Sequence, residues 1–281
     1  MSSFSKVSTG LSGLDEIINS LRMGDNVVWQ VDSIADYRRF VIPFVQEALA
    51  RKRKVIYMRF ANHGPLLEEG QATVTHHLTA NAGFESFSSQ VHGIITSAGR
   101  DAFYVFDSLS DLLMAWATAL MIGNFFFITC PYLFELNTVA YFALLRGRHS
   151  FKTIARIRET TQVLLDVYNN EGRICIHPLK VWQRYSPTMF LPHLQEGGRF
   201  TAIINSIEAT TLFSSLASRR GRGAERKLDF WDRLFMKAKD LLGRPDATEE
   251  RRAMVEQLSR IVLGREKRML GLVMEYFNLE E

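Results

Sequence analysis

The amino-acid sequence predicts an α/β protein whose mostly parallel sheet is flanked by helices, with a terminal antiparallel hairpin and a helical C-terminal appendage. Short apolar segments alternate with segments of helical periodicity over the first half of the chain. Two alternating segments then flank the turn-forming residues 169–172, and only helical patterns follow a basic, glycine-containing run. These patterns predict an α/β domain over residues 1–217, a basic linker over residues 218–227 and the appendage over residues 228–281.

The composition is typical of a soluble globular protein. The chain has 281 residues, of which 47% are hydrophobic and 23% charged, so it can bury a large core. The formal charge of +4 is too small to indicate nucleic-acid binding by itself. Cys130 and Cys175 lie far apart, and the polar N-terminus lacks the apolar stretch of a signal peptide. We therefore expect a cytoplasmic protein.

One apolar segment raises the question of a membrane. Residues 112–134 contain no charged side chain and are long enough to span a bilayer. The alternative is a buried helix followed by a buried strand, since strands of parallel sheets are covered on both faces and have no polar side. Gly123 and Asn124 interrupt the run and Pro131 ends it, so we expect the buried helix and strand and no membrane partner.

The expected elements follow from the spacing of apolar residues. We expect strands over residues 26–31, 54–60, 73–78, 102–106 and 125–129, and helices over residues 36–50, 83–97, 110–121 and 136–145. Residues 163–167 and 173–181 are expected to pair as a hairpin at the sheet edge. Two further helices are expected over residues 228–242 and 248–277.

Three segments together resemble the RecA/KaiC-like family of P-loop ATPases. They are STGLSGLDEI at residues 8–17, AFYVFDSLSDLL at residues 102–113 and PLKVWQRYS at residues 178–186. The resemblance covers roughly residues 5 to 195. It implies a RecA-like sheet, homo-oligomers formed through a RecA-type interface, and a magnesium-binding role for Asp107 at the Walker B position. It also implies that Lys180 and Arg184 face the nucleotide of a neighbouring subunit.

The sequence departs from this family where phosphate would bind. A working loop, GxxxxGK[ST], closes glycine N–H groups around phosphate, and its Lys and hydroxyl bind charge and magnesium. Here Val31 and Asp36 replace the two glycines, Tyr37 replaces the Lys, and Arg38 replaces the Ser/Thr. Asp32 and Asp36 would also repel a phosphate. The sequence therefore predicts that phosphate binding of the family type is lost.

The catalytic glutamate is also missing. The family carries this base just after the second strand, where the present chain has Ala61, Asn62 and His63. His63 is interpreted either as a surface residue or as a group with a chemical role. Asp107 is interpreted either as a magnesium-water ligand or as an inherited residue at the strand end that contacts nearby backbone.

The other candidates each have an ordinary structural alternative. Tyr37, Arg38, Arg39, Asp107, Lys180 and Arg184 could line a vestigial nucleotide or anion cleft, or could be surface and packing residues. His76 and His77 are neighbours on a strand and face opposite sides, which makes a poor metal pair. Cys130 is expected in the core, and Arg146 at the end of a helix. We expect no catalytic and no metal-binding residue.

These observations predict a RecA/KaiC-like pseudo-ATPase that acts as a non-catalytic regulatory or assembly subunit. It would need neither ATP nor magnesium. The alternatives are a nucleotide- or anion-binding protein without efficient hydrolysis, and a RecA-type nucleic-acid-associated protein. The ending EKRMLGLVMEYFNLEE resembles a segment ahead of the ATP-grasp region in phosphoenolpyruvate-synthase-like proteins, which implies a PEP/pyruvate-binding enzyme as a possible partner.

Overall fold

The computed structural model describes residues 5–61, 63–80, 83–114, 116, 119–170 and 172–223. The helices expected over residues 228–242 and 248–277 lie outside this range, as does the segment that suggested a PEP/pyruvate-binding partner. Of the predicted linker, residues 218–223 form the end of a helix, and only residues 224–227 lie outside the described range.

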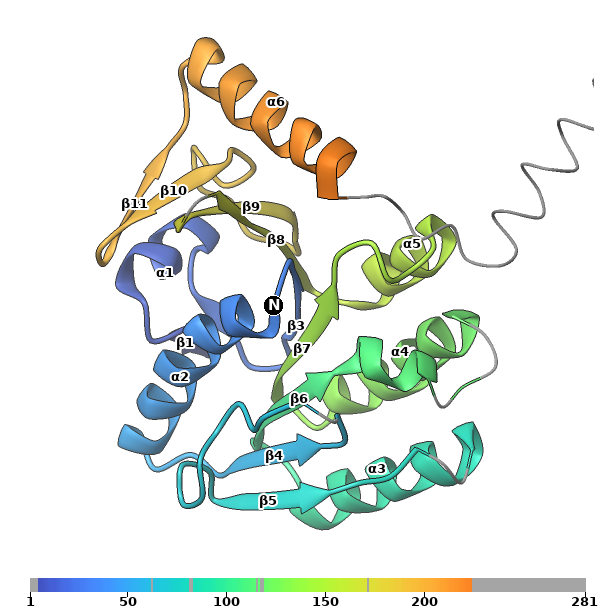
Figure 1. Ribbon diagram of the computed structural model, residues 1–281. Helices are drawn as coiled ribbons and strands as arrows, with labels where there is room; N and C mark the ends of the chain where they lie inside the picture. Colours follow the sequence, from blue (N-terminus) through green and yellow to red (C-terminus); the bar gives the residue numbers. More distant parts are fainter. Residues whose placement is uncertain are drawn as a thin grey trace, which may run out of the picture. The chain divides into compact units, whose positions relative to one another are not determined.

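The described part of the chain forms a nine-stranded sheet in the order β11-β10-β9-β8-β3-β7-β6-β4-β5 (Figure 1). Neighbouring strands from β8 to β5 are parallel, and those from β8 to β11 are antiparallel. The strands are β3 (Asn26–Val31), β4 (Val55–Arg59), β5 (Val74–His77), β6 (Phe103–Ser108), β7 (Val139–Leu145), β8 (Val163–Asn170), β9 (Arg173–Val181), β10 (His193–Glu196) and β11 (Arg199–Ala202). Two short strands, β1 (Lys6–Val7) and β2 (Leu21–Arg22), pair separately.

Helices cover both faces of the sheet (Figure 1). The first face packs against α1 (Ser12–Ile18) and α2 (Ile34–Ala50), and the second against α3 (Phe84–Ala98), α4 (Ala119–Glu135) and α5 (Phe151–Thr160). The chain also contains a 3₁₀ turn, η1 (Leu109–Met114), and a helix, α6 (Ser206–Gly223). Each covered face has its own buried apolar cluster, so the sheet separates two cores.

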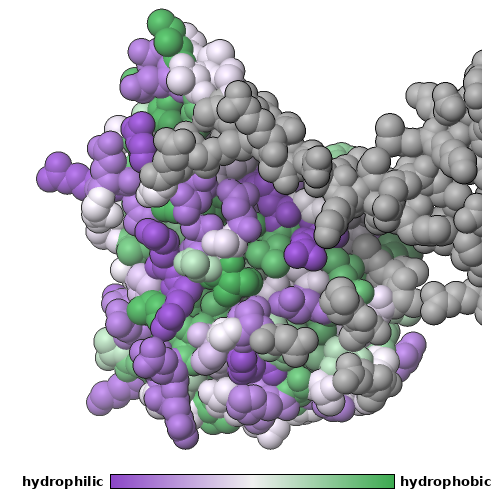
Figure 2. Space-filling model, viewed as in Figure 1, coloured by the Kyte–Doolittle hydropathy of each residue, from purple (hydrophilic) through white to green (hydrophobic). Residues whose placement is uncertain are grey.

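On the side of the molecule that Figure 2 shows, hydrophilic and hydrophobic residues are mixed over the surface, and no single apolar face dominates. Among the described helices, none combines the length and the apolar character needed to cross a bilayer.

The predicted α/β architecture with a mostly parallel sheet is confirmed, and so are most of its early elements. The strands expected over residues 26–31, 54–60, 73–78 and 102–106 are β3, β4, β5 and β6, and the helices expected over 36–50 and 83–97 are α2 and α3. The antiparallel hairpin is β8 and β9. It does not form the sheet edge as expected, because β10 pairs with β9 and β11 with β10.

The prediction for residues 110–145 is wrong. The segment 125–129, expected as a strand, lies within α4, and most of the segment 136–145, expected as a helix, forms β7. β7 is buried on both faces, and α4 has apolar residues even on its exposed side, such as Phe127 and Ile128, so neither element has the polar side that reveals a periodicity. Gly123 does not break α4, and the side chain of Arg156 packs against it: a Cβ at Gly123 would stand 2.9 Å from Arg156 Cδ. Arg146 consequently follows a strand and does not end a helix.

The N-terminal motif that carries part of the family resemblance has a structural role. The side chain of Asp15 accepts hydrogen bonds from the Ser8 hydroxyl at 2.5 Å and from the Thr9 backbone N–H at 2.8 Å. Gly10 has a φ of 80°, and a Cβ there would stand 2.2 Å from the carbonyl oxygen of Pro43 in α2. Only glycine allows this close approach, so the motif fastens the N-terminal segment to α2.

A buried ion pair joins the start of β3 to the segment after β9. The Nη1 atom of Arg184 lies 2.8 Å from Oδ2 of Asp25, and Nη2 lies 3.0 Å from Oδ1. Arg184 Nη1 also donates to the carbonyl oxygen of Ser20 at 2.7 Å. The Arg184 side chain has no exposed surface, so water could not take the place of either partner in this ion pair.

We expect Arg184→Met to lower the free energy of unfolding by roughly 3–5 kcal/mol, because it leaves the Asp25 carboxylate buried without its charge partner. Urea unfolding followed by circular dichroism measures the change. The control is Arg38→Met, which removes an exposed ion pair to Glu68 and should cost less than about 1 kcal/mol. Equal losses in the two variants would contradict the assignment.

Candidate functional site

The crevice at which an open α/β sheet binds its ligand lies between β3 and β7. β3 leads into α2 on one face of the sheet, whereas its neighbour β7 leads into α5 on the other face. Parallel strands whose connections diverge in this way leave a crevice at their carboxyl ends. The residues that follow β3 and β7 are Asp32 and Arg146, so these two decide what the crevice can hold.

The connection between β3 and α2 is too short to cradle a phosphate. Only Asp32 and Ser33 separate the strand from the helix. The Ser33 hydroxyl accepts a hydrogen bond from the backbone N–H of Asp36 at 3.2 Å, and itself donates to the Asp36 carboxylate at 2.7 Å. The N-terminus of α2 is therefore capped by its own side chains, with an acidic residue in the first turn.

Arg146 fills the crevice. Its Nε lies 2.7 Å from Oδ1 of Asp32, and its Nη1 lies 2.5 Å from Oδ1 of Asp166 on β8. Its Nη2 donates to the carbonyl oxygens of Val167 at 2.6 Å and Gln30 at 3.3 Å. The guanidinium carbon stands 4.3 Å from the centre of the Tyr168 ring, and only 11% of the side chain is exposed. One guanidinium thus links three adjacent strands, β7, β3 and β8.

The carboxylates beside the crevice are held by further internal contacts. Asn169 donates from its backbone N–H to Asp32 at 3.3 Å and from its side-chain amide to Asp36 at 2.7 Å. Burial lowers the pKa of the Arg146 guanidinium, but the Asp166 and Asp32 carboxylates more than reverse this effect and raise that pKa above its ordinary value. The crevice therefore holds a permanent cation that the chain itself supplies.

A second polar cluster surrounds Asp107 at the carboxyl end of β6. The Asp107 side chain is fully buried, with Nε2 of His63 at 2.8 Å from Oδ1 and Nη1 of Arg59 at 3.6 Å from Oδ2. The Tyr57 hydroxyl donates to Oδ2 at 3.1 Å, and the backbone N–H of Ser108 donates to Oδ1 at 3.1 Å. These groups compensate the charge that burial would otherwise make costly.

His63 belongs to this cluster and is not a free surface residue. Its side chain is 21% exposed, and its Nε2 also lies 3.8 Å from the Asp111 carboxylate. The imidazole and the Asp107 carboxylate carry opposite charges when the ring is protonated. Contact with the Asp107 carboxylate raises the pKa of the imidazole, and this effect exceeds the opposing effect of burial.

The predicted cleft residues separate into distinct places. Tyr37 is fully buried and donates to the carbonyl oxygen of Phe106 at 3.2 Å, which brings it close to Asp107. Burial raises the pKa of its hydroxyl well above the ordinary value. Arg38 lies 3.3 Å from Glu68 on the surface, and the Arg39 side chain is exposed.

Lys180 and Arg184 lie at the opposite end of the sheet from Asp107. Lys180 pairs with Leu164 near the start of β8, and its Nζ donates to the carbonyl oxygens of Arg158 and Glu159 at the end of α5. Burial, and then the nearby Arg158 charge, lower the pKa of the Lys180 ammonium. With Arg184 paired to Asp25, both cations are engaged within their own chain.

No known protein-family model matches this chain, and no curated protein matches its sequence.

The remaining candidates do not form a metal or nucleophile site in the part of the chain that the structure describes. No three His, Cys, Asp or Glu side chains there are grouped so that they could hold a metal ion. Cys130 is buried in α4, and burial raises the pKa of its thiol well above the ordinary value. A reactive cysteine requires the opposite shift.

Sequence reasoning identified Asp107 but missed the role of Arg146. The contact between Arg146 and Asp32 joins residues more than a hundred positions apart in the sequence, and no local sequence pattern indicates it. The available signal was the position of Arg146 directly after an apolar segment, but that segment was interpreted as a helix. Arg59 carried the same signal, a charged residue at the end of a buried strand.

We expect the contribution of His63 to stability to fall as the pH rises. Because its folded pKa is raised, that contribution is complete below the unfolded pKa of about 6.5 and is lost as the pH passes the folded value. His63→Gln should therefore cost more free energy of unfolding at about pH 6 than at about pH 8. Urea unfolding of both proteins at each pH measures the difference.

His92→Gln provides a control of opposite sign. Burial lowers the pKa of His92, so its contribution is present above the unfolded pKa and is lost as the pH falls. The cost of this substitution should shrink toward low pH. If both variants respond to pH in the same direction, the charged contact between His63 and Asp107 is not the cause.

Proposed function

We propose that this chain is a RecA/KaiC-like pseudo-ATPase that acts as a non-catalytic regulatory or assembly subunit. The supporting observation is that Arg146, bound to Asp32 and Asp166, occupies the crevice in which a nucleotide phosphate would bind. A phosphate entering this crevice would have to displace a buried guanidinium from two carboxylates. That displacement is costly because each carboxylate would lose its charge partner.

Two further features support the absence of hydrolysis. In the turn before α2, the backbone N–H of Asp36 donates to the Ser33 hydroxyl, and that hydroxyl donates to the Asp36 carboxylate. These two donors are therefore not directed toward a ligand. Asp107 is surrounded by His63, Arg59 and Tyr57, so a magnesium-bound water would have to replace contacts that stabilise a buried carboxylate. The groups that an ATPase directs toward its substrate are here directed toward one another.

An assembly role agrees with the retained scaffold. The sheet, the terminal hairpin and the N-terminal motif at Asp15 are all present, although the chemistry of the phosphate loop is lost. A scaffold of this kind can bind a partner through its surface without turnover. We propose that homo-oligomers form through the RecA-type face.

We expect no magnesium-dependent ATP turnover and no binding of a fluorescent ATP analogue at millimolar concentration. Titration with and without magnesium, together with a phosphate-release assay, measures both. Turnover that disappears in Asp107→Asn would overturn the proposal. Binding that does not require magnesium would instead support the alternative, a nucleotide-binding protein without hydrolysis that uses Arg38 and Arg39.

A further inference from the structure

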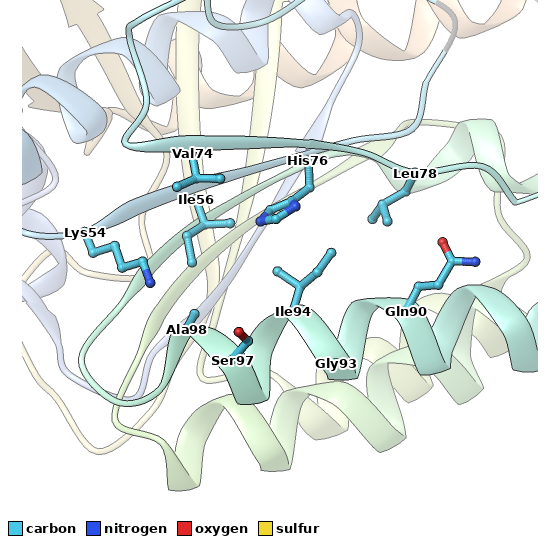
Figure 3. Close-up of a pocket in the computed structure, with 10 residues that line it drawn as sticks. All are labelled: Lys54, Ile56, Val74, His76, Leu78, Gln90, Gly93, Ile94, Ser97 and Ala98. Atoms are coloured by element: carbon cyan, nitrogen blue, oxygen red, sulfur yellow. The ribbon is translucent and has the colours of Figure 1, made fainter.

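A groove unrelated to the crevice runs along the edge of the sheet, between β5 and α3. It encloses about 420 Å³, which lies within the range of pockets that bind small organic molecules. Figure 3 shows the side chains of the strands and of α3 facing each other across this space. The lining residues are Lys54, Ile56, Val74, His76, Leu78, Gln90, Gly93, Ile94, Ser97 and Ala98.

The walls of the groove combine an apolar surface with unengaged polar groups. Ile56, Leu78 and Ile94 supply apolar side chains, whereas Lys54 and His76 supply nitrogen atoms. Within the described residues, the side chains of Lys54 and His76 make no hydrogen bond and no ion pair. This differs from the crevice, where each charged group has a partner. Figure 3 shows the His76 ring projecting into the space between strand and helix.

Gly93 leaves open space on the helix side of the groove. It lies in the interior of α3, where glycine is the least favourable residue after proline. Its backbone does not need glycine, because its φ is not positive, and a Cβ added there would have no heavy atom within 4 Å. Local helix stability would therefore favour a larger residue. A reason to keep glycine is the close approach of a ligand to the helix backbone.

The charges of the groove select its occupant. Lys54 is the lysine that lines the groove, and its ammonium group can donate to an anion. The apolar walls require an apolar body beside the anionic group. A small carboxylate with an aromatic or aliphatic body meets both requirements.

We propose that the groove between β5 and α3 binds a small organic carboxylate, with the carboxylate at Lys54 and His76 and the apolar body against Ile56, Leu78, Ile94 and the backbone of Gly93. This site is separate from the crevice at Arg146 and does not depend on the function proposed for the chain.

The first experiment titrates the full chain with 4-phenylbutyrate and with its neutral amide, followed by ¹H–¹⁵N NMR. The backbone resonances of His76 and Gly93 should shift with the carboxylate. The amide should bind at least about tenfold more weakly than the carboxylate, because it loses the charge-assisted contacts. Equal binding of the two compounds, or no shift at millimolar carboxylate, would overturn the proposal.

Substitutions then test the geometry. Gly93→Leu should abolish binding while unfolding occurs at the same or a higher urea concentration, since leucine favours the helix and fills the groove. Lys54→Met should raise the Kd about tenfold. The matched control is Lys152→Met, which removes an exposed lysine from α5 and should leave the Kd unchanged. Wild-type affinity in Gly93→Leu would exclude this groove as the site.

Two further measurements test for other occupants of the groove. Binding of the extended acidic peptide acetyl-Val-Asp-Val-amide in the groove, without binding of 4-phenylbutyrate, would replace the small-molecule assignment with a peptide. Concentration-dependent dimers that Gly93→Leu disrupts, measured by analytical ultracentrifugation, would replace it with a second copy of the chain. Either result contradicts the proposal.

Discussion

The contact of Arg146 with Asp32 and Asp166 organises the carboxyl edge of the sheet. Arg146 and Asp32 directly follow β7 and β3, and Asp166 lies within β8 opposite Gln30. A single guanidinium therefore holds together strands whose connections leave toward opposite faces. Removing that cation would leave two carboxylates close together without a partner. An internal ion pair already occupies the crevice, so the charged groups at the edge where open α/β sheets bind ligands are here engaged within the chain itself.

The same physical constraint explains the other buried carboxylates. Asp107 is compensated by His63, Arg59 and Tyr57, and Asp25 by Arg184, because an uncompensated charge inside a protein is too costly to keep. A carboxylate that binds a substrate or a metal directly must keep contacts in reserve for it. Neither Asp107 nor Asp25 does so. This satisfaction of the polar groups is the physical basis for the non-catalytic function that we propose.

The groove beside β5 is the contrasting case. Its lysine and histidine are unengaged within the described residues, its walls are apolar, and a glycine is kept where the helix would favour another residue. Unused polar groups next to apolar surface are what a binding site presents before its ligand arrives. The polar groups of the crevice have partners, whereas the side chains of Lys54 and His76 in the groove have none among the described residues. A ligand-binding site is therefore expected in the groove rather than in the crevice.

The sequence by itself determined the α/β class, the first strands, α2, α3 and the antiparallel hairpin, because their apolar periodicities and turn residues are local. It also located Asp107 at a strand end. Only the tertiary structure decided that residues 125–129 are helical and 139–145 a strand, since both segments are apolar on every side, including the exposed Phe127 and Ile128, and therefore show no periodicity. It alone also decided that Arg146 closes the crevice. That contact depends on strand order, which brings distant residues together and which no local pattern specifies.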